Sequence, residues 1–207
     1  MSEFDALRIA VHGHTGKLGS LIMNHATAIP VPKNTEVPNV DVIIDVSSAT
    51  GLRSLLPRLT GQALLVGTTG DLPWTELEAY AQRAPVAVVP NFSVGVPVLL
   101  SLIDTALKML PEGWDIEVIE AHHNQKQDAP SGTAKRLIKA VEEHGYKNIP
   151  SHALRVGDTF GEHTVWMCGP GERIELKHVA TRREVFAIGA HRWANWLHSQ
   201  PKGLIQA

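Results

Sequence analysis

Two adjacent histidines and a nearby lysine stand out in the segment EAHHNQKQDAPSGTA, which spans residues 120–134. Histidine titrates close to neutral pH, so His122 or His123 can give or take a proton there, and Lys126 adds a second proton donor and a positive charge. Two adjacent histidines alone are more often a surface feature or a stray metal site. The residues around the pair are therefore needed to favour a catalytic interpretation.

The second half of the same segment predicts the start of a helix. Proline followed by a small hydroxyl residue, as at Pro130 and Ser131, is typical of a helix start. The backbone N–H groups near Gly132 and Thr133 then lack helical partners and suit an anion. Each such contact contributes only about 0.3 to 1 kcal/mol at an exposed terminus, so a dicarboxylate would also need Lys126 and a histidine.

A glycine-rich loop, GHTGKLG at residues 13–19, follows the apolar run at residues 7–11. A strand, a tight glycine turn and a helix start together place N–H groups and the positive end of a helix dipole where a pyrophosphate can bind. Glycines that merely close a turn are the simpler alternative. His12 and His14 would form a metal site only with further ligands, which the loop does not offer. The position of the loop favours a dinucleotide site.

The residue that would bind the ribose of such a nucleotide is not identifiable from the sequence. Dinucleotide sites usually carry an acidic residue about 20 positions past the glycines. Residues 30–39 contain Glu36, but also Lys33 and three prolines, and they predict no convincing second strand. The choice between NADH and NADPH therefore stays open.

The elements that must position these residues alternate between strands and helices over the first 92 residues. Short apolar runs predict four buried strands, and the segments between them predict helices. Strands separated by helices imply a parallel sheet with right-handed crossovers. The predicted strands cover residues 7–11, 41–46, 62–66 and 86–89, and the predicted helices cover residues 18–28, 50–59 and 75–84.

Past residue 92 the order of elements changes and indicates a second domain. The fold class we expect is α/β, with a Rossmann-like parallel sheet in the N-terminal domain and a mixed sheet in an α+β domain. The first domain would cover residues 1–92, completed by a C-terminal helix within 184–207, and the second would cover residues 93–183. The helices expected here cover residues 96–110, 131–144 and 186–197, and the strands cover 115–121, 153–156, 164–167 and 173–179.

The composition argues against several classes of function. The chain has 207 residues and a net charge of −2 with acidic and basic residues interleaved, so it has no basic field for a nucleic acid. The apolar run at residues 94–110 is broken by Pro97, Asp104 and Lys108, so we expect no membrane segment, and the N-terminus does not resemble a signal peptide. The single cysteine, Cys168, suits a reducing compartment, and we expect a cytoplasmic protein.

Together these motifs resemble the 4-hydroxy-tetrahydrodipicolinate reductase family, also called the dihydrodipicolinate reductases. Residues 120–134 match every defined position of the family signature EAHHxxKxDAPSGTA. The GTTG at residues 67–70, the NFSVGV at residues 91–96 and the GEH at residues 161–163 are similar to further family motifs. The resemblance spans nearly the whole chain.

The resemblance implies an NAD(P)H-dependent oxidoreductase of lysine biosynthesis through diaminopimelate. The implied reaction reduces 4-hydroxy-2,3,4,5-tetrahydrodipicolinate to 2,3,4,5-tetrahydrodipicolinate with loss of water. The implied cofactor is NADH or NADPH, the substrate is a small-molecule dicarboxylate, and no metal takes part. The family also implies a homotetramer, held together through the second domain.

The same resemblance assigns roles to individual residues. It makes His122 the catalytic proton donor or acceptor and Lys126 a proton donor, while His123, Gly132 and Thr133 hold the substrate carboxylates. The implied cofactor contacts lie in the glycine loop, in the GTTG turn and at the hinge between the domains. They are Gly13, His14, Thr15, Gly16, Lys17, Leu18, Gly67, Thr68, Thr69, Val89, Pro90, Asn91 and Phe92.

Some positions depart from the family pattern. The chain is short, and the loop before the GEH turn is reduced to residues 151–159. Lys17 and Leu18 stand where an Arg-Met pair is common, and Pro97 stands where Asn is usual. These departures bear on cofactor binding, because none of them touches a proton-transfer residue.

Two other functions are compatible with such a fold. A dinucleotide sensor without turnover would keep the scaffold, but the intact His122 and Lys126 argue against it. A semialdehyde dehydrogenase would need a cysteine nucleophile. Cys168 is far along the chain from any apparent base, which predicts a core thiol instead.

Overall fold

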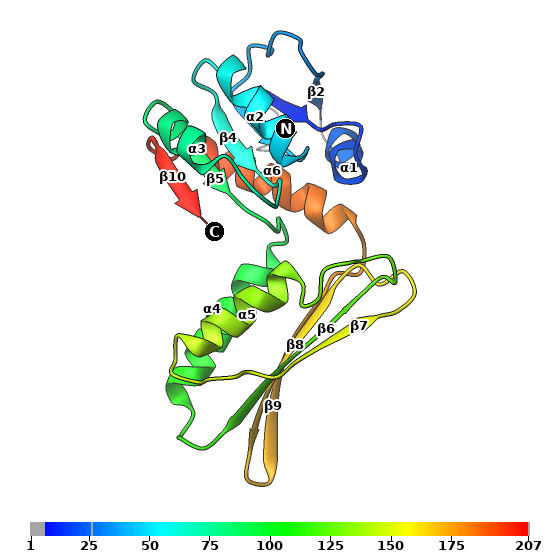
Figure 1. Cartoon of the computed structure of the whole chain (residues 1–207), viewed down its shortest axis with the longest axis vertical. Coiled ribbons are helices and arrows are strands. Elements are labelled where there is room, and N and C mark those ends of the chain that lie inside the picture. The colour runs from blue at the N-terminus through cyan, green and yellow to red at the C-terminus, as the bar shows by residue number, and fades with distance from the viewer. Residues whose placement is uncertain (1–6, 26, 207) are drawn as a thin grey trace. The chain divides into compact units, whose positions relative to one another are not determined.

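The computed structural model describes residues 7–25 and 27–206. These residues form two compact units, both drawn in Figure 1. The first unit contains the described residues up to Phe92 and those from Arg183 onward, whereas the second spans Ser93–Arg182. The chain therefore leaves the first unit once and returns to it near its C-terminus.

A six-stranded parallel sheet forms the centre of the first unit. The strand order is β10-β5-β4-β3-β1-β2, and every neighbouring pair is parallel. This arrangement confirms the predicted α/β class with a parallel sheet. The strands are β1 (Ile9–His12), β2 (Ala28–Val31), β3 (Val42–Asp45), β4 (Ala63–Val66), β5 (Pro85–Val88) and β10 (Gly203–Gln206).

Helices cover both faces of this sheet. Along β3, Ile43 packs into one apolar cluster with Leu52 of a covering helix, whereas Ile44 packs into another cluster with Ala190. Successive residues of a strand point to opposite faces. Strands buried on both faces are continuous apolar runs, which is why the sequence showed no alternation there. The helices are α1 (Lys17–His25), α2 (Ala49–Leu55), the 3-10 helix η1 (Leu56–Arg58), α3 (Trp74–Ala81) and α6 (Glu184–His198).

The prediction of four strands in this unit is wrong, because it lacks both edge strands. The helix expected over residues 18–28 ends at His25, and β2 begins at Ala28. Pro30 is tolerated within β2 because an edge strand does not need every N–H for pairing. β10 was not expected at all. Both strands are four residues long and partly exposed, so neither shows the signature of a buried run.

The second unit is built on a four-stranded mixed sheet in the order β7-β6-β8-β9. β6 and β7 are parallel, while β6–β8 and β8–β9 are antiparallel, which confirms the predicted mixed sheet. Two helices pack on one face through Leu99, Ile103 and Leu137. The elements are α4 (Gly95–Met109), β6 (Asp115–His122), α5 (Gly132–Glu142), β7 (Ser151–Arg155), β8 (Glu162–Gly169) and β9 (Glu172–Val179).

Burial alternates along β6, so one face of this sheet contacts the helices and the other does not. Glu120 and His122 lie on the covered face, near the end of the strand. The two units differ in this respect, since the first sheet is covered on both faces. Within the described part of the chain, no helix is long and apolar enough to cross a membrane.

Candidate functional site

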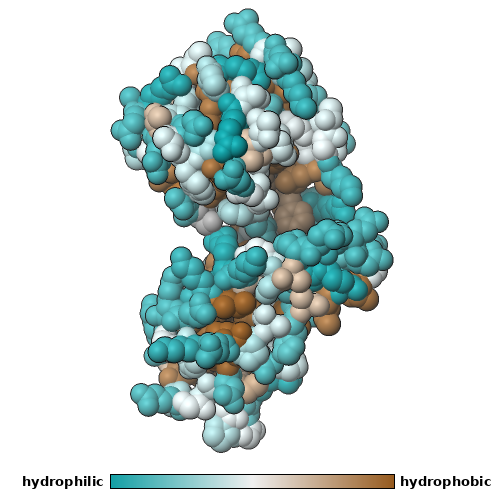
Figure 2. Space-filling view, in the orientation of Figure 1, coloured by the Kyte–Doolittle hydropathy of each residue, from teal (hydrophilic) through white to brown (hydrophobic). Residues whose placement is uncertain are grey.

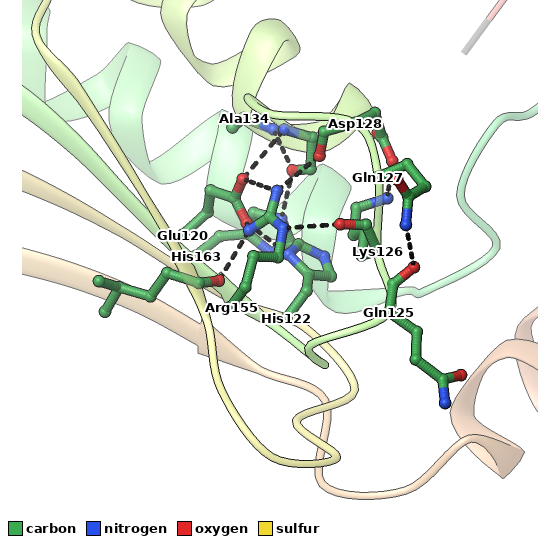
Figure 3. Close-up of polar contacts among 11 residues, drawn as sticks. Glu120, His122, Gln125, Lys126, Gln127, Asp128, Ala134, Arg155 and His163 are labelled. Carbon is green, nitrogen blue, oxygen red and sulfur yellow. Dashed lines mark hydrogen bonds and ion pairs between the residues drawn. The ribbon is translucent and has the colours of Figure 1, made fainter.

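A buried carboxylate lies beside the first of the two predicted histidines. Glu120 and His122 are two residues apart on β6, so their side chains share one face of the strand. Both are buried, and the Nδ1–H of His122 donates a hydrogen bond to the Glu120 carboxylate. Figure 3 shows this pair at the centre of a polar network. The bond orients the imidazole and leaves its Nε2 as the nitrogen available for chemistry.

Arg155 supplies the positive charge that keeps this carboxylate buried. β7 lies beside β6 in a register that pairs Arg155 with His122. Its Nη1 and Nη2 donate to the two Glu120 oxygens at 2.9 and 2.8 Å, a bidentate pair. The guanidinium also donates to the backbone carbonyls of Lys126 and Asp128. Arg155 therefore holds both the carboxylate and the loop that carries Lys126.

The network sets the ionisation of both acidic and basic partners. Burial by itself raises the pKa of Glu120, but hydrogen bonds from Arg155 and His122 outweigh it, so the pKa is lowered. Burial lowers the pKa of His122, and the Glu120 carboxylate acts against that effect. Glu120 is therefore charged, while the pKa of His122 stays below its ordinary value because burial outweighs the carboxylate.

Lys126 lies in the loop after β6 and is partly exposed. Its Nζ lies 2.7 Å from Asp128 Oδ1, and its backbone N–H donates to the carbonyl of His123 at 3.1 Å. The positive charge of Lys126 is close enough to contribute to the lowered pKa of His122, after the larger effect of burial. Two groups able to transfer protons therefore lie at the same end of β6.

The predicted helix start is present and is tied to the same network. Ser131 caps α5, since its Oγ accepts the N–H of Ala134 at 3.2 Å. The Ser131 N–H donates to Glu120 Oε1 at 3.1 Å. Gly132 and Thr133 are the first two residues of the helix, so all the predicted substrate residues belong to one connected segment.

Sequence reasoning missed the GEH histidine as part of this site. His163 pairs with Glu120 across β6 and β8, and its ring lies edge-on to His122 with centroids 5.2 Å apart. Burial lowers the pKa of His163 to about 4, so its imidazole is neutral at physiological pH. Gly161 in the same turn has a φ of +148°, and a Cβ there would lie 3.3 Å from the His122 Nε2. The GEH motif thus keeps space open at the His122 Nε2.

In the first unit the backbone of the glycine loop packs so closely against its neighbours that Gly13 and Gly19 leave no room for a side chain. Gly13 has a φ of +86°, and a Cβ there would lie 2.6 Å from the carbonyl oxygen of Val46. A Cβ on Gly19 would lie 2.1 Å from the Gly13 carbonyl oxygen. The loop therefore needs glycine to bring the start of α1 against the end of β1, as a pyrophosphate cradle requires.

Beside this loop lies a cavity of about 270 Å³. Three of the predicted cofactor residues line it, together with residues of β1, of the end of β2 and the segment after it, and of α2 and the segment before it. Its lining consists of His12, Gly13, His14, Thr15, Val31, Lys33, Ser47, Ser48, Thr50, Gly51 and Ser54. A concave site of polar groups next to a glycine loop fits the phosphates and ribose of a dinucleotide.

A second buried carboxylate, not foreseen from the sequence, contacts two residues of this lining. Asp45 at the end of β3 accepts hydrogen bonds from His12 Nδ1 at 2.7 Å, Ser47 Oγ at 2.7 Å and Thr68 Oγ1 at 2.6 Å. His12 is therefore engaged by Asp45. In the described residues, no group of three or more His, Cys, Asp or Glu side chains is arranged to hold a metal ion.

The remaining predicted cofactor residues belong to the first unit but do not line this cavity. Gly67 to Thr69 follow β4, and a Cβ on Gly67 would contact the Phe92 ring at 2.5 Å. Val89 and Phe92 are buried in the apolar core, so packing accounts for them. For this second group a cofactor role stays a prediction; it comprises Gly16, Lys17, Leu18, Gly67, Thr68, Thr69, Val89, Pro90, Asn91 and Phe92.

Cys168 is not the core thiol that the sequence predicted. The residue is partly exposed near the end of β8, where it pairs with Asp115 and Arg173. Core prediction failed because Cys168 falls on the face of the sheet that the helices leave uncovered. It is five residues along the strand from His163, or roughly 17 Å at strand rise, which places it away from the histidines.

Comparisons with known proteins agree with this site. The family model described as "Dihydrodipicolinate reductase, C-terminus" matches residues 95–207. A 4-hydroxy-tetrahydrodipicolinate reductase of Anaeromyxobacter dehalogenans is 40% identical over 188 residues, covering 79% of this chain and 70% of the relative. One from Stenotrophomonas maltophilia is 37% identical, covering 95% of this chain and 94% of the relative. One from Archaeoglobus fulgidus is 34% identical, covering 92% and 94%.

Solved structures show the same fold. A dipicolinate-bound dihydrodipicolinate reductase from Paenisporosarcina sp. TG-14 has a TM-score of 0.72 at 22% identity, covering 97% of each chain. A probable dehydrogenase from Thermotoga maritima has a TM-score of 0.62 at 10% identity, covering 97% of this chain and 91% of that one. With the buried Glu120–His122 pair, the family model and these relatives in agreement, the chain belongs to the dihydrodipicolinate reductase family.

Proposed function

We propose that the chain reduces 4-hydroxy-2,3,4,5-tetrahydrodipicolinate to 2,3,4,5-tetrahydrodipicolinate with loss of water, using NADH or NADPH, in lysine biosynthesis through diaminopimelate. Family membership and the names of relatives covering more than nine-tenths of the chain support an oxidoreductase of this kind. The single observation that carries the proposal is the histidine oriented by a buried carboxylate beside Lys126.

The first unit, which runs up to Phe92 and resumes at Arg183, is the proposed dinucleotide domain. Its glycine loop would hold the pyrophosphate, with Gly13, His14 and Thr15 at the cavity wall. The close approach of Gly13 to Val46 and of Gly19 to Gly13 fits this use, since side chains would close the cradle. When bound, a reduced nicotinamide supplies the hydride.

The second unit, Ser93–Arg182, is the proposed substrate domain. His122 would hold or release a proton at Nε2, because its Nδ1–H is engaged by Glu120. Lys126 would be a second proton donor. His123, Gly132 and Thr133 would hold the substrate carboxylates at the start of α5, where N–H groups and the helix dipole favour an anion.

The open face of the second sheet supports the proposed homotetramer. Leu154 and Val179 lie on this face, in one cross-strand row, and are 52% and 42% exposed. Figure 2 shows hydrophobic surface on this unit beside β7. Exposed apolar side chains on an uncovered sheet are typical of an association surface. A monomeric mass by light scattering at micromolar concentration would contradict the tetramer.

A cytoplasmic location stays a prediction, which a single unpaired cysteine suits.

Substrate-dependent oxidation of the reduced nicotinamide tests the proposed function. The substrate is generated enzymatically, and both NADH and NADPH are supplied in turn. We expect turnover with wild type, and competitive inhibition by pyridine-2,6-dicarboxylate, a flat analogue of the ring. Cofactor binding without any substrate-dependent oxidation would instead indicate a dinucleotide sensor.

A further inference from the structure

A buried histidine outside the proposed proton-transfer pair contacts the start of α5. His163 is 3% exposed, and its Nε2 lies 3.2 Å from the Oγ of Ser131, which is also buried. Figure 3 shows His163 within the same polar cluster as Glu120 and Ala134. The two residues of this contact come from β8 and from the N-cap of α5, 32 positions apart in the sequence. His163 therefore reaches the helix start that is proposed to hold the substrate carboxylates.

Donor and acceptor counts fix the direction of the hydrogen bond between His163 and Ser131. The Ser131 Oγ already accepts the N–H of Ala134 at 3.2 Å, and among the described residues its hydroxyl proton has the His163 Nε2 as acceptor. If His163 donated instead, the Ser131 hydroxyl proton and the His163 Nδ1 would both be buried without a partner in that part of the chain. Because buried unpaired polar groups are costly, the arrangement with only one of them is favoured. Ser131 therefore donates to Nε2, and His163 carries its proton on Nδ1.

His163 can accept this bond because its imidazole is neutral and held in place. Burial lowers the pKa of His163 to about 4, so Nε2 keeps its lone pair at physiological pH. The ring lies edge-on to His122, with centroids 5.2 Å apart, and stacks on His178, with centroids 6.5 Å apart. His178 is in turn hydrogen-bonded through its Nε2 to the Ser93 Oγ at 3.1 Å. His163 is therefore a neutral acceptor in a fixed position.

Ser131 connects the helix start to the proton-transfer pair through two different groups. With its hydroxyl proton directed to His163, its Oγ lone pair accepts the Ala134 N–H and caps the first turn of α5. Its backbone N–H donates separately to Glu120 Oε1 at 3.1 Å. Loss of the His163 acceptor should therefore disturb the cap while the bond to Glu120 stays in place.

We propose that His163 is a positioning residue, whose Nε2 fixes the Ser131 hydroxyl and thereby the first turn of α5 in the orientation that binds a substrate carboxylate. In this role His163 acts through Ser131 rather than on the substrate. The inference rests on the proposed function only in taking the start of α5 as the carboxylate site. It predicts a selective loss of substrate affinity, because His122 and Lys126 keep their partners when His163 is changed.

Calorimetry with pyridine-2,6-dicarboxylate, on protein saturated with reduced cofactor, measures this affinity directly. His163→Phe keeps a ring beside His122 but removes the acceptor, whereas His163→Gln returns an amide oxygen near the position of Nε2. We expect His163→Phe to weaken the analogue about 10-fold, the scale of a lost helix cap. The substrate KM should rise by a similar factor, with kcat within about 2-fold of wild type. His163→Gln should restore most of the affinity.

A double-variant cycle separates this role from general structural support. Ser131→Ala should weaken the analogue by a similar factor. Adding His163→Phe to Ser131→Ala should weaken it no further, because the hydroxyl on which His163 acts is gone. Multiplicative effects of the two substitutions would overturn the inference. A large fall in kcat with unchanged KM in His163→Phe would also overturn it, because that result places His163 in the chemical step.

Hydrogen exchange of the Ala134 amide supplies a readout that needs neither ligand nor turnover. This amide should exchange faster in His163→Phe and in Ser131→Ala than in wild type, and His163→Gln should resemble wild type. His144→Phe, the same substitution at a histidine paired with Asp104, is the matched control and should change neither exchange nor affinity.

The two readouts keep this inference separate from the proposed function. Unchanged exchange and unchanged analogue affinity in His163→Phe, with substrate-dependent turnover in wild type, would overturn the inference and leave the reductase intact. A wild type that neither binds the analogue nor turns over the substrate would overturn the proposed function. Exchange of the Ala134 amide would then still decide whether His163 fixes the cap of α5.

Discussion

The two units bind their proposed ligands with different parts of the chain. The site in the second unit is made of charged side chains, with the Glu120 carboxylate fully buried between Arg155 and His122. The cavity in the first unit depends on backbone space at Gly13 and on the fold of short loops. Substitutions in the second unit should therefore change proton transfer and its pH dependence, whereas those in the first should change cofactor affinity.

Loss of either proton-transfer group is expected to have the largest effect. We predict that His122→Ala and Lys126→Ala each lower kcat by about 10² to 10⁴-fold, the range for a positioned general acid. Cofactor affinity, measured by direct titration, should stay within about 2-fold of wild type because both residues lie in the second unit. His144→Ala, which removes a histidine paired with Asp104, is the matched control. Wild-type turnover in either variant would remove that residue from the mechanism.

Neutralising the buried carboxylate should have a smaller effect on rate but a distinct effect on pH dependence. We predict that Glu120→Gln lowers kcat about 10- to 100-fold, the scale on which loss of a carboxylate that orients a metal-bound histidine lowers activity. Burial lowers the pKa of His122 and the Glu120 charge opposes this, so the variant should lower that pKa further. The alkaline limb of the pH–rate profile then moves to lower pH. An unmoved limb would show that Glu120 has only a structural role.

Removal of the guanidinium should appear in stability more than in cofactor binding. Arg155→Met leaves the Glu120 charge buried without its main partner, which we expect to cost about 3 kcal/mol of unfolding free energy at neutral pH. The pKa of Glu120 is lowered in wild type and should rise in the variant, so this stability is present at neutral pH and is lost on acidification. The stability deficit of the variant should shrink as the pH falls from the pKa of Glu120 in the unfolded chain toward its lowered pKa in the folded protein.

An exposed pair in the same unit supplies the contrast for that measurement. Lys108→Met breaks the ion pair between Lys108 and Asp104. Both of these side chains are largely exposed. Such pairs contribute about 0 to 1 kcal/mol. If denaturant unfolding gave Arg155→Met and Lys108→Met equal deficits, the buried network would not be a special stabilising feature.

The smallest effect is expected from the glycine loop. Gly13→Ala places a Cβ against the Val46 carbonyl at a positive φ, so the loop must shift. We predict a rise of about 10-fold in the cofactor KM, on the scale of 1.4 kcal/mol, with kcat at saturating cofactor nearly unchanged. A large fall in kcat with unchanged cofactor affinity would break the distinction between the two units.

Local patterns in the sequence determined much of this molecule. The continuous apolar runs of β1, β3, β4 and β5 predicted a parallel sheet, because strands covered on both faces need apolar residues at every position. Ser131 identified the start of α5 because a hydroxyl at that position caps a nearby N–H. His122 and Lys126 were found because they lie within one continuous motif.

Only the tertiary structure decided which distant residues complete the two sites. Arg155 meets Glu120 across 35 positions, and Asp45 meets His12 across 33, and both pairings depend on strand register. β2 could not be found from the sequence because it is a short edge strand with an internal proline and exposed positions. Such a strand forms because β1 lies beside it in the sheet. The local sequence of β2 carries no periodicity that would predict this pairing.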